Sequence, residues 1–153
     1  MGNGLSMVIS VVTLLVSLSS VASNVIELPT ARTLKIVYKA SKRFGVDSQD
    51  LLKIAFLESS FKETAVRVNK NGTIDLGMFQ INSVHWSTTC KAFDIFTLEG
   101  NAYCAAKLVK LAKEGAREDD EHWIGRYHSK TPSLKVAYAN KVQSVNLIGG
   151  SRK

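Results

Sequence analysis

The sequence lacks most of the patterns by which proteins hold metal ions or nucleic acids. Its two cysteines and three histidines show no CxxC or HxxxH spacing, which argues against a metal site. Zinc-finger spacing, an RNA-recognition signature and a basic stripe are all missing, although the net charge is +7. The 20 lysines and arginines are scattered along the chain, so the charge favours an anionic partner but does not indicate nucleic acid.

Internal repeats, low-complexity linkers and any sign of a second domain are also missing. At 153 residues the chain is long enough for one domain with a real hydrophobic core. Hydrophobic residues make up 45% and charged residues 22%, which is ordinary for a globular protein and argues against disorder. The sequence therefore predicts a single folded domain.

Charged side chains are absent from the first 26 residues. The apolar centre of this segment, Val8 to Val16, is followed by small residues, as in a secretory signal peptide. We expect residues 1–23 to form that signal, with cleavage after Ala22 or Ser23. The usual basic residue before the apolar core is missing, and the segment is nearly long enough to span a bilayer, so an uncleaved anchor is the alternative. Either way, the rest of the chain is predicted to lie outside the cytoplasm.

The two cysteines, Cys90 and Cys104, fit an exported protein, in which we expect them to form a disulfide. Closing a loop of this size would stabilise the fold by about 3 kcal/mol in the chain-entropy model. Two buried free thiols are the alternative. His85, His122 and His128 are isolated in the sequence and are expected to be structural or exposed. No metal or organic cofactor is implied.

Beyond the signal, apolar residues recur mostly at helical spacing. Thr30 can cap a first helix that Gly45 ends, and Asp47 or Ser48 can start a second helix. The apolar content of that second helix is too dense for a helix on the surface. Further helices are predicted over residues 99–115, 119–129 and 132–145, the last with a proline at its start.

Between these helices, the Asn-Gly turn signal in "NKNGT" breaks the helical pattern. Together with "TIDLGMFQI" it predicts a loop or small hairpin rather than a sheet. The sequence thus predicts a mainly α domain over residues 30–147, with a loose tail at 148–153.

Glu58 is a candidate general acid because it ends a mostly apolar run, residues 51–57. On a helix its neighbours one turn back are Ile54 and Ala55. An apolar wall disfavours the ionised carboxylate and raises its pKa, as a general acid near neutral pH requires. Lys62 would oppose this shift if the helix continued far enough to bring it near. The alternative is a glutamate on the solvated edge of a helix.

Asp75 is the second candidate, seventeen residues further along and just before a glycine. An aspartate before glycine is commonly a turn or cap residue. The sequence spacing does not give the distance between the two carboxyl groups, and in glycosidases that distance separates a nucleophile from a residue that activates water.

The string "LESSFKETAVRVNKNGTIDLGMFQIN" resembles the catalytic core of the lysozyme-like superfamily, particularly the bacterial lytic transglycosylases. Glu58-Ser59 matches the opening of the family motif, and residues 77–81 match its Gly-x-x-Gln-Ile ending. A third family element is usually Tyr-Asn-Ala-Gly, so in "RYHSKTP" Tyr127 matches whereas His128 and Ser129 depart. Small exported transglycosylases of type III and type IV secretion and pilus systems look similar. The resemblance covers residues 30–145.

This resemblance implies a helical lysozyme-like (goose-type or SLT) domain with a saccharide groove and a β-like hairpin flap. Glu58 would protonate the glycosidic oxygen between MurNAc and GlcNAc of peptidoglycan and then deprotonate the MurNAc 6-hydroxyl, which closes a 1,6-anhydro ring. Gln80 and Asn82 match groove positions, and Tyr127 matches a tyrosine that positions sugar and acid. Ser59 matches the motif serine, which we interpret as more structural than chemical. The expected location is the periplasm, with secretion or pilus components as partners.

Asp75 is a departure from this family, because many transglycosylases rely on one glutamate. The pattern "ES-F…D-G--QINS--W" also resembles animal C-type lysozymes, which have a second carboxylate at this place. Those enzymes carry several disulfides, which two cysteines cannot supply. Hydrolysis by Glu58 and Asp75 together is therefore the first alternative function. A wall-binding secretion-assembly protein with weak activity is the second.

Overall fold

The computed structural model describes residue 26 and residues 28–147. The expected signal peptide, residues 1–23, and the expected tail, residues 148–153, lie outside the described residues. No helix in the described part of the chain is both long enough and apolar enough to cross a membrane.

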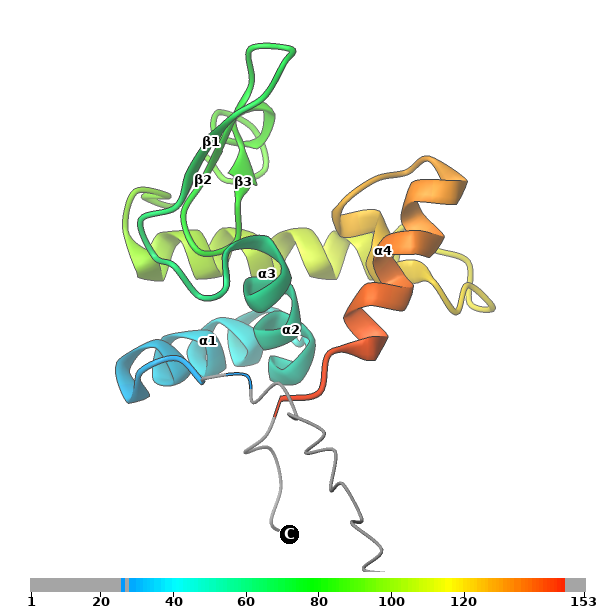
Figure 1. The fold of residues 1–153 in the computed structure, drawn as a ribbon, viewed down its shortest axis with the longest axis horizontal. Helices are drawn as coiled ribbons and strands as arrows, with labels where there is room; N and C mark the ends of the chain where they lie inside the picture. The colour runs from blue at the N-terminus through cyan, green and yellow to red at the C-terminus, as the bar shows by residue number, and fades with distance from the viewer. Residues whose placement is uncertain (1–25, 27, 148–153) are drawn as a thin grey trace, which may run out of the picture.

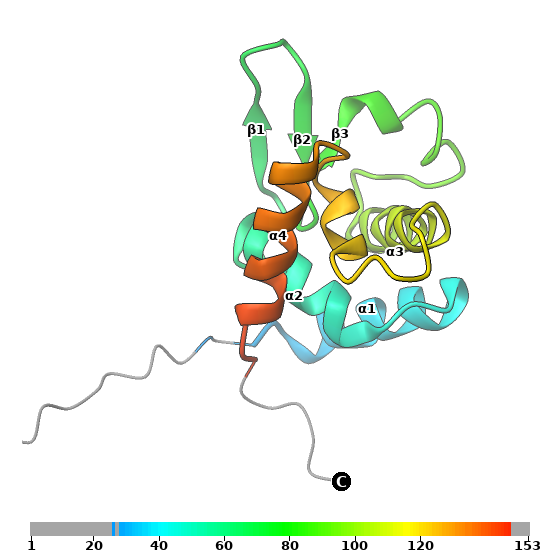
Figure 2. The ribbon, with the colours of Figure 1, turned by 90° about the vertical axis from the view of Figure 1, so that its right-hand side faces the viewer.

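Helices make up most of the described chain, and a small antiparallel sheet projects from them (Figures 1 and 2). The α-helices are α1 (Ala31–Phe44), α2 (Ser48–Ser59), α3 (Leu98–Glu114) and α4 (Pro132–Ser144). Two short 3-10 helices, η1 (Ser83–His85) and η2 (Trp123–Tyr127), precede α3 and α4 respectively. The strands are β1 (Val66–Val68), β2 (Ile74–Leu76) and β3 (Ile81–Asn82). This mainly helical architecture confirms the predicted fold class.

The helix boundaries follow the capping signals in the sequence. The Thr30 side chain accepts a hydrogen bond from the backbone N–H of Thr33, and Gly45 ends α1 in the left-handed conformation, at φ 65°. Asp47 caps α2 by accepting from the N–H of Gln49. Pro132 occupies the first turn of α4, where its missing N–H costs no hydrogen bond. These predicted starts and stops are confirmed.

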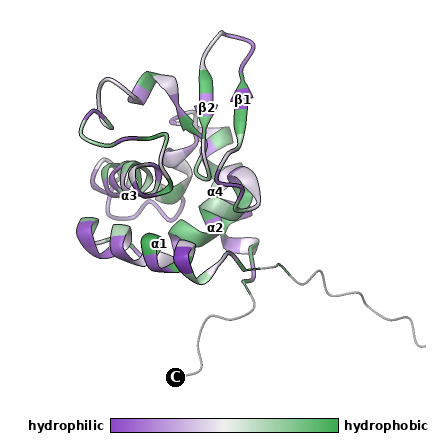
Figure 3. Ribbon diagram, turned by 90° about the vertical axis from the view of Figure 1, so that its left-hand side faces the viewer, coloured by the Kyte–Doolittle hydropathy of each residue, from purple (hydrophilic) through white to green (hydrophobic). Residues whose placement is uncertain are grey.

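The hydrophobic core lies between the helices and the base of the sheet. α2 contributes fully buried side chains, among them Leu51 and Ile54, in agreement with its dense apolar content (Figure 3). Met78 and Phe79, which follow the strand β2, are also fully buried and join the sheet to this core. The core therefore reaches to the foot of the sheet.

A disulfide between Cys90 and Cys104 links α3 to the segment that follows η1, with a Cα–Cα distance of 5.2 Å. The predicted pairing is confirmed. The disulfide also holds the chain that leaves the sheet against the long helix beneath it (Figure 1).

The sheet has one strand more than the predicted hairpin. β1 pairs with β2 as expected around the Asn-Gly turn, and β2 also pairs with β3, which makes a three-stranded antiparallel sheet. β3 has two residues, too few to show the alternating pattern by which strands are recognised. We call residues 66–82 the flap.

Candidate active site

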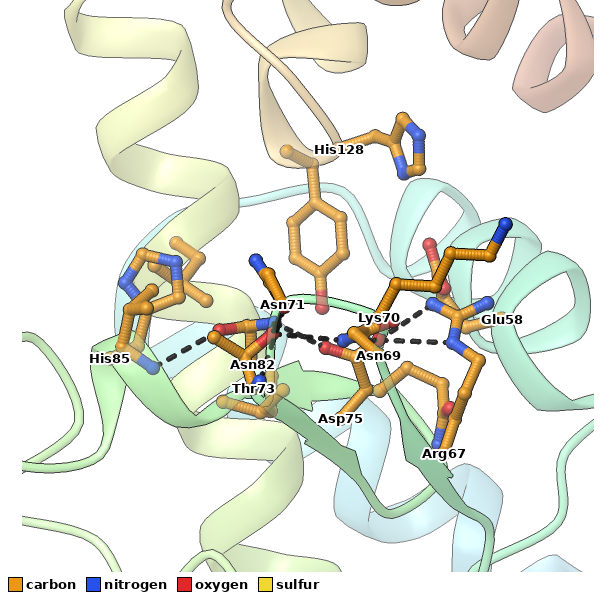
Figure 4. Close-up of a pocket in the computed structure, with 15 residues that line it drawn as sticks. Glu58, Arg67, Asn69, Lys70, Asn71, Thr73, Asp75, Asn82, His85 and His128 are labelled. Atoms are coloured by element: carbon orange, nitrogen blue, oxygen red, sulfur yellow. Dashed lines mark hydrogen bonds and ion pairs between the residues drawn. The ribbon is translucent and has the colours of Figure 1, made fainter.

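A cavity of about 520 Å³ lies between the flap, the end of α2 and the turn after η2 (Figure 4). The flap supplies most of its lining, including side-chain amides and the carboxylate of Asp75. Of the residues predicted for the site, the cavity brings together Glu58, Asp75, Gln80, Asn82 and Tyr127. Ser59 is not part of its lining.

Glu58 is half-buried in the last turn of α2. Its Oε1 accepts a hydrogen bond of 2.6 Å from the hydroxyl of Tyr138 in α4. Burial raises the pKa of Glu58, and this effect exceeds the opposing effects of the Tyr138 hydrogen bond and of the positive charges of His128 and Arg67. A raised pKa shifts the carboxyl towards the protonated form, which is the form that a general acid requires.

Helix α2 ends before Lys62, so the Lys62 ammonium group does not lower the pKa of Glu58. The backbone of Ser60 and Phe61 is left-handed, with φ values of 53° and 65°, so the chain turns away directly after Ser59. Lys62 is not among the groups that shift the pKa of Glu58. The effect of burial on the pKa of Glu58 is therefore not opposed by Lys62.

Asp75 lies in β2, between Arg67 in β1 and Asn82 in β3, because the strand register pairs it with both. Its Oδ2 accepts from Nε and Nη2 of Arg67, at 3.0 and 2.7 Å, and from Nδ2 of Asn69 at 2.9 Å. Its Oδ1 accepts from Nδ2 of Asn82 at 2.6 Å. Asp75 is thus a strand residue with both oxygens in use, and the turn interpretation does not describe its position.

The surroundings of Asp75 favour its charged form. Burial, with 5% of the residue exposed, acts to raise the pKa of the carboxyl. The hydrogen bonds from Asn69, Arg67 and Asn82 outweigh that effect and hold the pKa of Asp75 below its ordinary value. Asp75 is therefore a fixed negative charge facing the same cavity as Glu58 (Figure 4).

The other motif residues hold one turn of the backbone, which joins β2 to β3. The hydroxyl of Ser59 donates to the carbonyl of Met78 and that of Tyr127 to the carbonyl of Phe79, both at 2.8 Å. The Gln80 amide donates to the Gly77 carbonyl at 2.9 Å.

Asn101 of α3 completes this set by donating to the carbonyl of Leu76 at 2.9 Å and accepting from the N–H of Phe79 at 3.0 Å. Four consecutive carbonyls, from residue 76 to residue 79, thus accept hydrogen bonds from the side chains of four different segments. We call this arrangement the carbonyl clamp. It places Gln80 and Asn82 in the cavity wall.

Sequence reasoning missed several residues of the site. Tyr138 is separated from Glu58 by 80 positions, so no local pattern links them. The turn signal alone would also not have found Arg67, because a two-residue turn at Asn71-Gly72 would place residue 68 opposite residue 75, whereas the observed three-residue loop, 70–72, pairs Arg67 with Asp75. The remaining residues missed in the cavity lining include Asn69, Lys70, Asn71, His85 and His128.

Two of the histidines, expected to be structural or exposed, line the cavity. His128 is exposed and its ring stacks on that of Tyr138, with centroids 4.8 Å apart and planes 1° apart. His85 lies at the far end of the cavity from Glu58 in Figure 4, and burial lowers its pKa. Within the described residues no group of three or more histidines, cysteines or carboxylates could hold a metal ion.

Comparison with known proteins relates this geometry to a family. The family described as "Transglycosylase SLT domain" matches residues 35–140. Protein IpgF of Shigella flexneri is 47% identical over 47 residues, which is 31% of each chain. Invasion protein IagB of Salmonella typhimurium is 45% identical over 47 residues, 31% of this chain and 29% of its own.

Human lysozyme-like protein 6 is 39% identical over 81 residues, 45% of this chain and 55% of its own length. Each of these matches spans less than two thirds of the relative. The family match, in contrast, covers more than half of this chain and includes Glu58, the flap and most of α4. The chain therefore belongs to the transglycosylase SLT domain family and has a lysozyme-like fold.

Proposed function

We propose that this protein is a lytic transglycosylase that cleaves the β-1,4 bond between MurNAc and GlcNAc in peptidoglycan and leaves 1,6-anhydro-MurNAc ends. The family match supports a transglycosylase, and the observation that carries the cleavage of a glycosidic bond is the contrast between the two carboxylates of the cavity. Glu58 is half-buried with a raised pKa, whereas Asp75 is ionised and held at both oxygens. One group can donate a proton, and the other supplies a negative charge.

In the proposed reaction, Glu58 protonates the glycosidic oxygen while its bond to C1 of MurNAc breaks, and GlcNAc leaves with a free 4-hydroxyl. The Glu58 carboxylate then accepts the proton of the MurNAc 6-hydroxyl as that oxygen bonds to C1. Glu58 returns to its protonated form and no water is consumed. The Tyr138 hydroxyl would stabilise the carboxylate between these steps, because it donates to Oε1.

Asp75 is proposed to assist through its charge. Positive charge develops on the sugar ring in the transition state, and a buried carboxylate facing the same cavity stabilises it. Its hydrogen bonds from Arg67 and Asn69 engage Oδ2, and the bond from Asn82 engages Oδ1, so the carboxylate is held in place in its ionised form.

Hydrolysis by Glu58 and Asp75 is the second candidate function. It is favoured by the position of Asp75 in the same cavity as Glu58 and by the similarity to lysozyme-like protein 6. The two reactions give different products, since an anhydro end is lighter than a reducing end by one water.

We further propose that the enzyme acts after export, in the periplasm, where it opens the wall for a secretion or pilus apparatus. The similarity to a protein named for invasion supports this setting, as do the motifs shared with secretion-associated transglycosylases.

Mass spectrometry of digested peptidoglycan tests the proposed reaction. We expect anhydro-muramyl ends, and Glu58→Gln should lower the rate by about 100-fold to 10,000-fold while leaving the melting temperature close to that of the wild type. Glu118→Gln is a matched control, because it removes an exposed carboxylate in the loop after α3. Products with only reducing ends would instead establish the hydrolytic reaction, and equal rates for wild type and Glu58→Gln would remove Glu58 from the mechanism.

A further inference from the structure

A second cavity, of about 290 Å³, adjoins the first on the side of α4. The two cavities share Glu58, Arg67 and His128 in their linings. The groove therefore continues past the proposed acid, from the flap towards α4. We call this second cavity the α4 pocket.

The α4 pocket differs in chemistry from the cavity under the flap. The flap cavity contains four side-chain amides, those of Asn69, Asn71, Gln80 and Asn82, which suit the hydroxyl and acetamido groups of sugars. The lining of the α4 pocket has none, and its only acidic group is Glu58, which the proposed reaction already uses. A further sugar ring is therefore not the ligand that this pocket fits best.

Apolar side chains form one wall of the α4 pocket. Leu134 and Ala137 are one turn apart on the exposed face of α4, and 51% of Leu134 is open to solvent. A small methyl-bearing group would cover both side chains and remove this apolar surface from water.

Two cations reach the same pocket from different elements. Lys141 comes from the last turn of α4, is exposed, and forms no ion pair among the described residues. Arg67 comes from β1 and uses Nε and Nη2 to hold Asp75, which leaves Nη1 without a hydrogen-bond partner within the described part of the chain. The pocket therefore offers two cationic donors beside an apolar wall, a combination that suits a carboxylate ligand.

We propose that the α4 pocket binds the peptide attached to the muramic sugar, with Lys141 and Arg67 contacting its carboxylates and with Leu134 and Ala137 contacting its alanine methyl groups. This inference rests on the proposed function, because that function supplies a sugar that carries such a peptide. The peptide is attached through the lactyl group at C3 of the same muramic ring whose bond at C1 is cleaved, and the lining of the pocket includes Glu58. The enzyme would then prefer strands that still carry peptides.

The test compares kcat/KM on peptide-bearing glycan strands and on the same strands stripped by an amidase. Lys141→Glu should lower the ratio of the two values by about 10-fold, because it replaces an attraction with a repulsion. Lys141→Arg should keep the ratio of the wild type. The matched control is Lys39→Glu, which makes the same charge change on the exposed surface of α1 and should leave the ratio unchanged.

Other outcomes would overturn the inference. If Lys141→Glu lowers kcat/KM equally on both substrates, Lys141 contacts the glycan or acts only through the overall charge of the protein. A ratio equal to that of the wild type would show that the peptide does not bind in the α4 pocket. If the wild type cleaves neither substrate, the proposed function fails, and calorimetric titration with a disaccharide peptide and with the peptide-free disaccharide then decides the inference. Tighter binding of the peptide form, lost in Lys141→Glu, supports it, whereas equal binding of the two forms refutes it.

Discussion

At the scale of single residues, the candidate site contains two carboxylates whose surroundings move their pKa values in opposite directions. Burial raises the pKa of Glu58 in its apolar setting, whereas hydrogen bonds from Asn69, Arg67 and Asn82 overcome burial and lower that of Asp75. Such a division is a common way for one cavity to hold both an acid and a fixed charge. The two residues should therefore respond differently to substitution.

Asp75→Asn should lower activity by about 10-fold to 100-fold, less than Glu58→Gln, because only through-space stabilisation of the sugar cation is lost. The melting temperature should also fall, since the ion pair with Arg67 is broken. Because the folded-state pKa of Asp75 is lowered, its contribution to stability is fully present above the unfolded-state pKa and disappears as the pH falls through the folded-state pKa. Thermal melts of both proteins across acidic pH measure this. Unchanged activity would leave Asp75 as a purely structural residue of the flap.

Tyr138→Phe should move the alkaline limb of the pH–rate profile to higher pH. The hydroxyl of Tyr138 favours the ionised form of Glu58, so its removal raises the pKa of Glu58 further. In the proposed mechanism, activity falls on the alkaline side as Glu58 loses its proton, so this limb of the profile moves with the pKa of Glu58. The maximal rate should fall because the carboxylate formed in the reaction loses its donor. The ring remains to stack on His128, and a limb that moves to lower pH would contradict this role for Tyr138.

At the scale of elements, the base of the flap is held from the helices. Asn101 of α3 contacts the backbone on both sides of Gly77, which has a φ of 75°. A Cβ added at Gly77 would lie 2.5 Å from Nδ2 of Asn101. Residue 77 is therefore glycine for two reasons: its backbone is left-handed, and the Asn101 side chain of α3 leaves no room for a Cβ.

Gly77→Ala should destabilise the protein by about 2–4 kcal/mol, because it adds left-handed strain and displaces the Asn101 amide. Gly72→Ala is the matched control: Gly72 has a φ of 80°, but a Cβ there meets nothing within 4 Å, so only the strain of about 1–2 kcal/mol applies. Urea unfolding of both variants measures the difference. Equal losses would show that Asn101 does not couple the flap to α3.

At the scale of the whole molecule, the parts predicted from the sequence are those with local signals. The capping residues Thr30, Gly45 and Asp47 predict where helices begin and end. The apolar run before Glu58 predicts a buried helix and a raised pKa for Glu58. The rest depends on contacts between distant segments. No pattern near Tyr138 indicates that it reaches Glu58 across 80 positions, and β3 is too short to be recognised before its pairing is known.

The motif residues show the same limit. The resemblance predicted that Ser59, Gln80 and Tyr127 belong to the site but not the contacts that they make. Each of the three donates a hydrogen bond to the backbone between β2 and β3, which is a property of the assembled fold.

The carbonyl clamp fixes the flap at its base only. Its fixed end lies in the core at Met78 and Phe79, whereas its outer end at Asn71-Gly72 is exposed. Changes of length or sequence at the outer end would reshape one wall of the groove while the position of Gln80 remains set from below. Variation in substrate preference among chains with this clamp can therefore accumulate at the flap tip without any change in the proposed acid.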